Sequence, residues 1–171
     1  MSETVHHAIK LLDLRFEPPS SVHAKYHGVV MLARVTDKAK AAAFGHLGEY
    51  NFNCPLDRAV LGYLQIDGEE YLRVVRAAKG EADIEAYVLP FIAKKSPEDI
   101  EKWNYNFIHY VPPHGSDSWA RLVKMRDQYA PDRVDIVNWA DVLDLDEGRI
   151  VPFRGGAASV EPLVDGESST G

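Results

Sequence analysis

The chain has 171 residues, of which 46% are hydrophobic and 26% charged, and its formal net charge is −7. This length favours one sizeable core, and this composition is typical of a folded chain rather than an intrinsically disordered one. Broad phosphate-binding surfaces need clustered Lys and Arg, so the acidic balance argues against nucleic-acid binding. No apolar run approaches the roughly 20 residues of a membrane helix, so we expect no membrane partner.

Cysteine usage and the N-terminal residues bear on the cellular compartment. Cys54 is the single cysteine of the chain, which rules out an internal disulfide and a multi-cysteine zinc site. Residues 1–14 carry Glu3, Lys10 and Asp13 and lack the layout of a signal peptide. We therefore expect a cytoplasmic protein.

The first predicted element is a long helix. A Pro pair within residues 14–21 predicts an extended segment before it. The helix is then expected from about residue 22 to residue 44, and to cover at least Gly28 to Ala42, because apolar residues recur at helical spacing. Those residues are Gly28, Leu32, Val35, Ala39 and Ala42.

Capping residues, prolines and glycines predict six further helices along the chain. Pro90 is expected to kink or end the third of them. Residues 134–137 are predicted to be coil, because a lone strand has no pairing partner. The fold class is therefore all-α, with one domain over residues 1–153 and a flexible Gly/Ser-rich tail over residues 154–171. The six helices are predicted at residues 55–64, 67–78, 81–93, 97–110, 118–129 and 138–144.

Several short strings along the chain are distinctive as a combination. They are Asp13-Leu14-Arg15, Pro18-Pro19, Leu32-Ala33-Arg34 with Asp37-Lys38, the run GEYNFNCPLD at residues 48–57, Trp103-Asn104, and DLDEGR at residues 144–149. Together they resemble a bacterial domain-of-unknown-function family, number 5069, over about residues 13–150. The resemblance implies a bacterial source and a single domain, and it implies no activity.

The main candidate binding site combines the predicted first helix with the loop that follows it. On a helical wheel, the side opposite the apolar face carries a cationic stripe of His23, His27, Arg34 and Lys38. In that stripe the Arg34 guanidinium could bind a phosphate or carboxylate through two parallel hydrogen bonds, and the Lys38 ammonium could add a single positive charge. The alternative, which we favour, is a solvated helix face in which Asp37 neutralises Arg34. The candidate binding residues are His27, Arg34, Asp37, Lys38, Tyr50 and Asn53.

Two further patterns suggest metal or thiol chemistry. His23 and His27 are four residues apart, which suits two ligands of one metal on a helix, but no third ligand follows and we predict no metal site. Cys54 precedes a predicted helix and would suit a reactive thiol with His46 as its base. A small buried apolar cysteine is the commoner role, and we favour it here.

The predicted C-terminal helix ends in an acidic cluster, where negative charge is unfavourable against the helix dipole. Its spacing does not fit a calcium-binding loop. Ion pairing is the simpler expectation, with Arg149 or the cationic stripe as partner. The cluster consists of Asp141, Asp144, Asp146 and Glu147.

No catalytic motif stands out, so enzyme status is open with a lean against catalysis, and no cofactor is predicted. The main hypothesis is a non-catalytic binding or interaction protein, with a homodimer through the aromatic residues of the 97–110 helix as one form of it. The alternative is an enzyme or small-molecule binder with an anion site between the first helix and the 48–57 loop. A cavity shared by Arg34 and Tyr50 would favour the alternative, and a flat apolar patch the main hypothesis.

Overall fold

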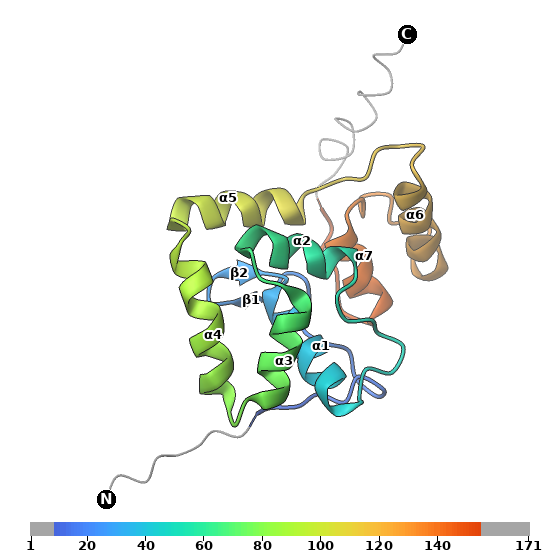
Figure 1. Cartoon of the computed structure of the whole chain (residues 1–171). Helices are drawn as coiled ribbons and strands as arrows, with labels where there is room; N and C mark the ends of the chain where they lie inside the picture. Colours follow the sequence, from blue (N-terminus) through green and yellow to red (C-terminus); the bar gives the residue numbers. More distant parts are fainter. Residues whose placement is uncertain (1–8, 155–171) are drawn as a thin grey trace, which may run out of the picture. The chain divides into compact units, whose positions relative to one another are not determined.

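The computed structural model describes residues 9–154 (Figure 1). The chain folds into two compact units, one ending at Tyr105 and the other beginning at Asn106. The predicted all-α class is confirmed, because the described residues form seven helices and one short β-hairpin. The single domain over residues 1–153 stays a prediction, and the tail predicted from residue 154 lies outside the described residues apart from Arg154. The helices are α1 Leu32–Phe44, α2 Pro55–Leu64, α3 Gly68–Ala77, α4 Glu81–Ala93, α5 Pro97–Ile108, α6 Asp117–Tyr129 and α7 Trp139–Asp146.

The predicted first helix is wrong over its first ten residues, where a hairpin of strands β1 (Lys25–Tyr26) and β2 (Val29–Val30) stands instead. The turn between the strands consists of His27 at φ 49° and Gly28 at φ 86°. Two left-handed residues in succession are the geometry preferred for two-residue hairpins, and β-branched valines favour strand. The Gly28 that seemed to extend an apolar helical face therefore turns the chain, and the minimum helix from Gly28 to Ala42 is corrected to start at Leu32.

Met31 separates the hairpin from α1. Its φ is 69°, its side chain is fully buried, and its carbonyl accepts the hydrogen bond of Val35 N–H at 3.0 Å. A left-handed conformation is uncommon for a residue other than glycine. The backbone thus changes direction at Met31 before helical hydrogen bonding starts, which is why helical spacing upstream of residue 32 was misleading.

The local signals for the other helices agree with the structure. Asp67, Ser96 and Ser116 each accept a backbone N–H three residues later with a side-chain oxygen, at 2.9–3.1 Å. These contacts satisfy donors that the first helical turn leaves unpaired. Pro90 lies inside α4, which continues to Ala93, so the expectation that Pro90 could end this helix is wrong. Residues 134–137 form no strand, as predicted.

In unit 1 the core lies mainly between α1 and α3, with α4 and α2 packed against them. Tyr71 is the largest fully buried side chain of this core. The Tyr71 hydroxyl and Thr36 Oγ1 are hydrogen-bonded to each other at 2.7 Å. Burial is the main reason that the pKa of the Tyr71 hydroxyl is raised. Other buried members of this core are Leu32, Val35, Ala39, Val60, Leu61, Leu64, Val75, Ile84 and Val88.

Unit 2 has a smaller core of its own between α6 and α7. Its four buried members come from α6, from α7 and from the two segments beside α7, and Trp119 and Trp139 pack against them. Trp139 also donates its indole N–H to Ser118 Oγ at 3.0 Å. The buried members are Leu122, Ile136, Val142 and Val151.

Within residues 9–154, no helix combines the length and the apolar character that crossing a membrane would require.

Candidate functional site

Three of the predicted binding residues meet around the extended segment before the hairpin. Arg34 is only 3% exposed, its guanidinium lies 5.7 Å from the centre of the Tyr50 ring, and it donates to Ser20 O at 3.2 Å. Asp37 Oδ2 accepts Ser20 N–H at 2.8 Å and also the Ser20 hydroxyl. The proximity of Arg34 and Tyr50 agrees with the expected geometry. These contacts fasten Ser20 and the Tyr50 ring to α1.

Lys38 lies in a second cluster, away from these contacts. Its Nζ donates to both carboxylate oxygens of Asp57, at 2.9 and 2.8 Å, and lies 3.4 Å from Cys54 Sγ. Lys38 and Asp57 side chains are 5% and 0% exposed. A bidentate pair of this kind satisfies two charges that could not otherwise be buried. Within residues 9–154 no hydrogen bond joins Cys54 to His46.

The remaining two predicted residues are separate again. Asn53 has φ 66° and its side chain lies against the start of α3, where a Cβ on Gly68 would come within 2.6 Å of Asn53 Oδ1. His27 lies in the hairpin turn, with Nε2 3.9 Å from Glu85 Oε2. Since His23 and His27 both precede α1, the predicted cationic stripe on one helix face does not form.

A pocket of about 420 Å³ opens in unit 1 between the hairpin and the turn that joins α4 to α5. Its apolar lining comes from the end of α4 and the start of α5, namely Ile92, Ala93, Pro97 and Ile100. Small-molecule sites typically have volumes of this order and are mainly apolar with a few polar groups. Of the predicted residues, His27 lines this pocket.

The hairpin wall of the pocket is held in place by Asn104 of α5. Asn104 Nδ2 donates to Gly28 O at 2.8 Å, and Oδ1 accepts Val30 N–H at 3.1 Å. Asn104 is 7% exposed and itself lines the pocket. One buried amide therefore fixes the distance between the hairpin and α5. The sequence carried a weak signal, because a polar residue four positions after Ile100 shares its helix face.

The helix wall of the pocket is braced by an aromatic stack. Trp103 of α5 stacks on Tyr63 of α2 with ring centres 4.7 Å apart, and Lys95 Nζ lies 4.6 Å from the centre of the Tyr63 ring. The Tyr63 hydroxyl donates to Asp99 Oδ2 at 2.8 Å. Burial, and then this bond to Asp99, raises the pKa of Tyr63 to about 12. Trp103 is thus packed, whereas Tyr105 is 64% exposed.

Charged groups of both signs line the pocket. Lys25 and His27 belong to the hairpin, Lys95 to the α4–α5 turn and Glu101 to α5. Three of these four groups are basic, so the site favours negative charge on a ligand. Neither Lys25, Lys95 nor Glu101 was singled out by the sequence, because each is an ordinary surface residue until the fold brings it to the pocket.

Beside the pocket wall, Tyr26 presents the one buried side-chain polar atom without a hydrogen-bond partner in residues 9–154, its hydroxyl oxygen. Burial and, after it, the charges of Glu85 and Glu81 raise the pKa of Tyr26 to about 12. The Tyr26 ring meets the His27 ring edge-on, with centres 4.5 Å apart. The hydroxyl therefore stays protonated at neutral pH.

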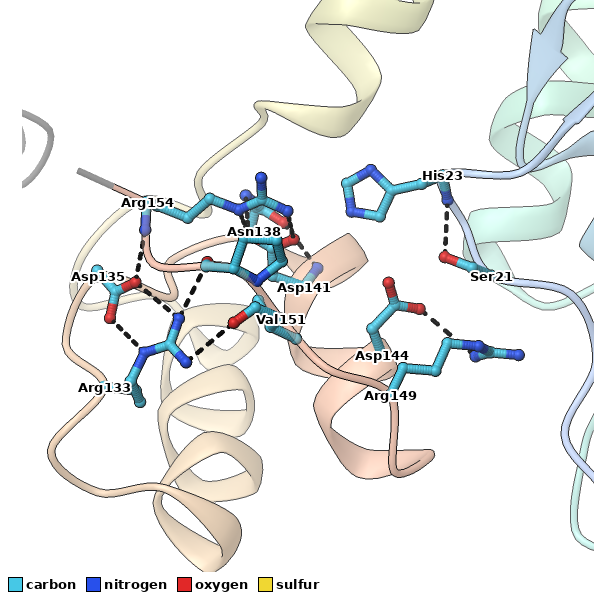
Figure 2. A network of polar contacts seen from close by, with 11 residues as sticks. Ser21, His23, Arg133, Asp135, Asn138, Asp141, Asp144, Arg149, Val151 and Arg154 are labelled. Carbon is cyan, nitrogen blue, oxygen red and sulfur yellow. Dashed lines mark hydrogen bonds and ion pairs between the residues drawn. The ribbon is translucent and has the colours of Figure 1, made fainter.

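In unit 2 three of the four residues of the predicted acidic cluster are paired with arginines, and Figure 2 shows two of them, Asp141 and Asp144. Arg149 bonds Asp144 at 3.4 Å and also Glu147, which confirms the expected partner. Arg154, which was predicted to begin the flexible tail, instead binds Asp141 through two guanidinium nitrogens at 2.9 and 2.7 Å. These pairs balance the negative charge that crowds α7.

The same network ties the last described residues to the start of α7 (Figure 2). Arg133 donates to both oxygens of Asp135 at 2.9 Å and to Val151 O at 3.0 Å. Arg154 N–H adds a bond to Asp135 at 2.9 Å. Arg133, followed by this backbone bond, keeps the pKa of Asp135 below its usual range. With its acceptors occupied by arginines, the network acts as a structural clasp.

A family model described as a domain of unknown function, DUF5069, matches residues 16–149. The chain belongs to this family. The resemblance read from the sequence is therefore confirmed, while a bacterial source stays a prediction. The curated proteins compared with the DUF5069 chain include no match. Within residues 9–154, no group of three or more His, Cys, Asp or Glu side chains is arranged to hold a metal ion.

Proposed function

We propose that this DUF5069 protein is a binding protein for a small organic anion that carries an apolar part. The observation that carries the proposal is the pocket of about 420 Å³, whose apolar lining meets three basic side chains. Apolar lining with a few polar groups is the usual composition of a small-molecule site. This is the small-molecule alternative predicted from the sequence, but at a different surface of unit 1.

The pocket supports the proposal better than the Arg34 cluster does. Arg34 and Lys38 are 3% and 4% exposed, and both make polar contacts within the chain. A ligand would have to replace those contacts and desolvate the site again. Lys25 is exposed at the pocket, so a ligand anion beside it displaces water rather than a side chain.

The test is a titration of the full chain with hexanoate, followed by calorimetry and by amide chemical shifts. We expect saturable binding, with shifts concentrated on the hairpin and residues 92–104. Lys25→Gln should weaken hexanoate binding about tenfold, which corresponds to about 1.4 kcal/mol. Its melting temperature should stay unchanged, because an exposed charge contributes little to stability.

Lys94→Gln is the matched control, because Lys94 is also exposed and lies next to Lys95 but is absent from the pocket lining. Hexanoate affinity in this variant should equal that of the unmodified chain. Equal affinity in Lys25→Gln would refute the proposed site. Shifts confined to Arg34 and Tyr50 would instead support the anion site expected from the sequence.

A further inference from the structure

Two opposite charges in the pocket have no side-chain partner among the residues that the structure describes. Lys25 of the hairpin and Glu101 of α5 both line the pocket, and in residues 9–154 neither has an ion pair or hydrogen bond through its side chain. Other charges nearby are paired, as Lys40 is with Glu81. A pocket that presents an unpaired cation on one wall and an unpaired anion on another is complementary to a ligand with both charges.

We infer that the ligand is a zwitterion with an apolar skeleton, an amino acid in the broad chemical sense. Its carboxylate lies toward Lys25 and His27, its ammonium toward Glu101, and its carbon skeleton against Ile92 and Ile100. This inference rests on the proposed function, because it assigns the substrate class of the same pocket.

Charge matching decides against simpler ligands. A plain carboxylate gains from Lys25 but brings negative charge near Glu101, and like charges lower affinity. A plain amine gains from Glu101 and meets three basic groups. Only a zwitterion places each charge beside an opposite one. The volume of about 420 Å³ lies near the lower end of small-molecule sites, which suits a single amino acid.

The experiment compares four probes of six carbons on the full chain by calorimetry: hexanoate, 2-aminohexanoate, 6-aminohexanoate and hexylamine. The two amino acids differ in the distance between their charges. The one that binds more tightly therefore indicates how far apart Lys25 and Glu101 hold the two ends of the ligand. We expect at least one of them to bind five times or more as tightly as hexanoate. Hexylamine should bind most weakly.

Glu101→Gln tests the ammonium contact directly. This variant should lose the preference for the amino acid, while its affinity for hexanoate stays equal or rises. Glu98→Gln is the control, because Glu98 is an exposed carboxylate on the same helix outside the pocket lining. The control should keep the fivefold preference.

The outcomes separate the two proposals. If hexanoate binds at least as tightly as both amino acids, or if Glu101→Gln keeps their preference, the zwitterion inference is wrong while the proposed anion site stands. If none of the carboxylates binds, the proposed function itself is refuted. Circular dichroism of each variant verifies that the fold is intact.

Discussion

Unit 1 contains two charged regions that differ in how their charges are matched. Along α1, Lys38 and Arg34 are buried, and Asp57 and Ser20 respectively contact them. At the pocket, Lys25 and Glu101 are exposed, and within the described residues no ion pair holds either of them. Both regions contain charges of both signs, but those along α1 are buried and those at the pocket are exposed. Burial decides whether a charge is paired within the fold or is available to a ligand.

A buried charge without a partner costs several kcal/mol, so a fold that buries a lysine must supply its counter-charge. An exposed charge keeps its water and can exchange it for a ligand. This reasoning identifies the α1 region as a brace between segments of unit 1. It also explains why the most conspicuous cations of the sequence are not those that line the pocket.

The largest effect is expected where the brace is broken. Asp57→Ala leaves Lys38 buried without its carboxylate, and such losses cost about 3–5 kcal/mol. Urea denaturation of the full chain measures this change in the free energy of unfolding. Glu49→Gln, at an exposed carboxylate in the neighbouring loop, should change it by less than about 0.5 kcal/mol. A similar, small change in both variants would remove the distinction between paired and unpaired regions.

A smaller effect is expected at the wall of the pocket. Asn104→Ala leaves the Val30 N–H and the Gly28 carbonyl without their side-chain partner, at a cost of about 1–3 kcal/mol. Hydrogen exchange at Val30 should accelerate, and hexanoate binding should weaken because the hairpin is no longer fixed to α5. Exchange at Val75 in α3 serves as the internal reference. Unchanged protection at Val30 would show that the hairpin is held by other contacts.

The smallest effect extends the comparison to the clasp of unit 2. Arg133 lowers the pKa of Asp135 from its ordinary 3.8, so the folded state binds the proton less tightly than the unfolded state. The pair therefore stabilises the fold above about pH 4. That stabilisation disappears as the pH falls through the lower folded pKa. Asp135→Asn should lose about 1 kcal/mol at pH 7.

Thermal unfolding between pH 7 and pH 2 measures this dependence. The melting temperature of Asp135→Asn should fall less steeply below pH 4 than that of the unmodified chain. Asp132→Asn, three residues after the end of α6 and exposed, should follow the unmodified chain. If the melting temperatures of Asp135→Asn and of the unmodified chain fall equally steeply below pH 4, the role assigned to Arg133 is wrong.

Helix positions after residue 54 could be predicted because their signals are local. A side-chain oxygen at Asp67 or Ser116 meets a backbone N–H three residues away, and Pro55 suits the first turn of α2. The hairpin was missed although its signals were also local. Apolar residues at helical spacing run through the turn formed by Gly28 and the β-branched pair that follows it, so the helical pattern hides the turn.

The sequence by itself determined the helical class, the family and most helix ends, since these depend on residues within a turn of one another. It also suggested that Arg34 could meet Tyr50, and the two side chains do lie together. The solvated helix face that it favoured is wrong, because Arg34 and Lys38 are buried. Only the tertiary structure decided which charges are buried and which line the pocket. Lys25 and Glu101 are 76 positions apart in the numbering, and their shared pocket depends on Asn104 bonding the hairpin to α5. No local pattern encodes a contact over that separation.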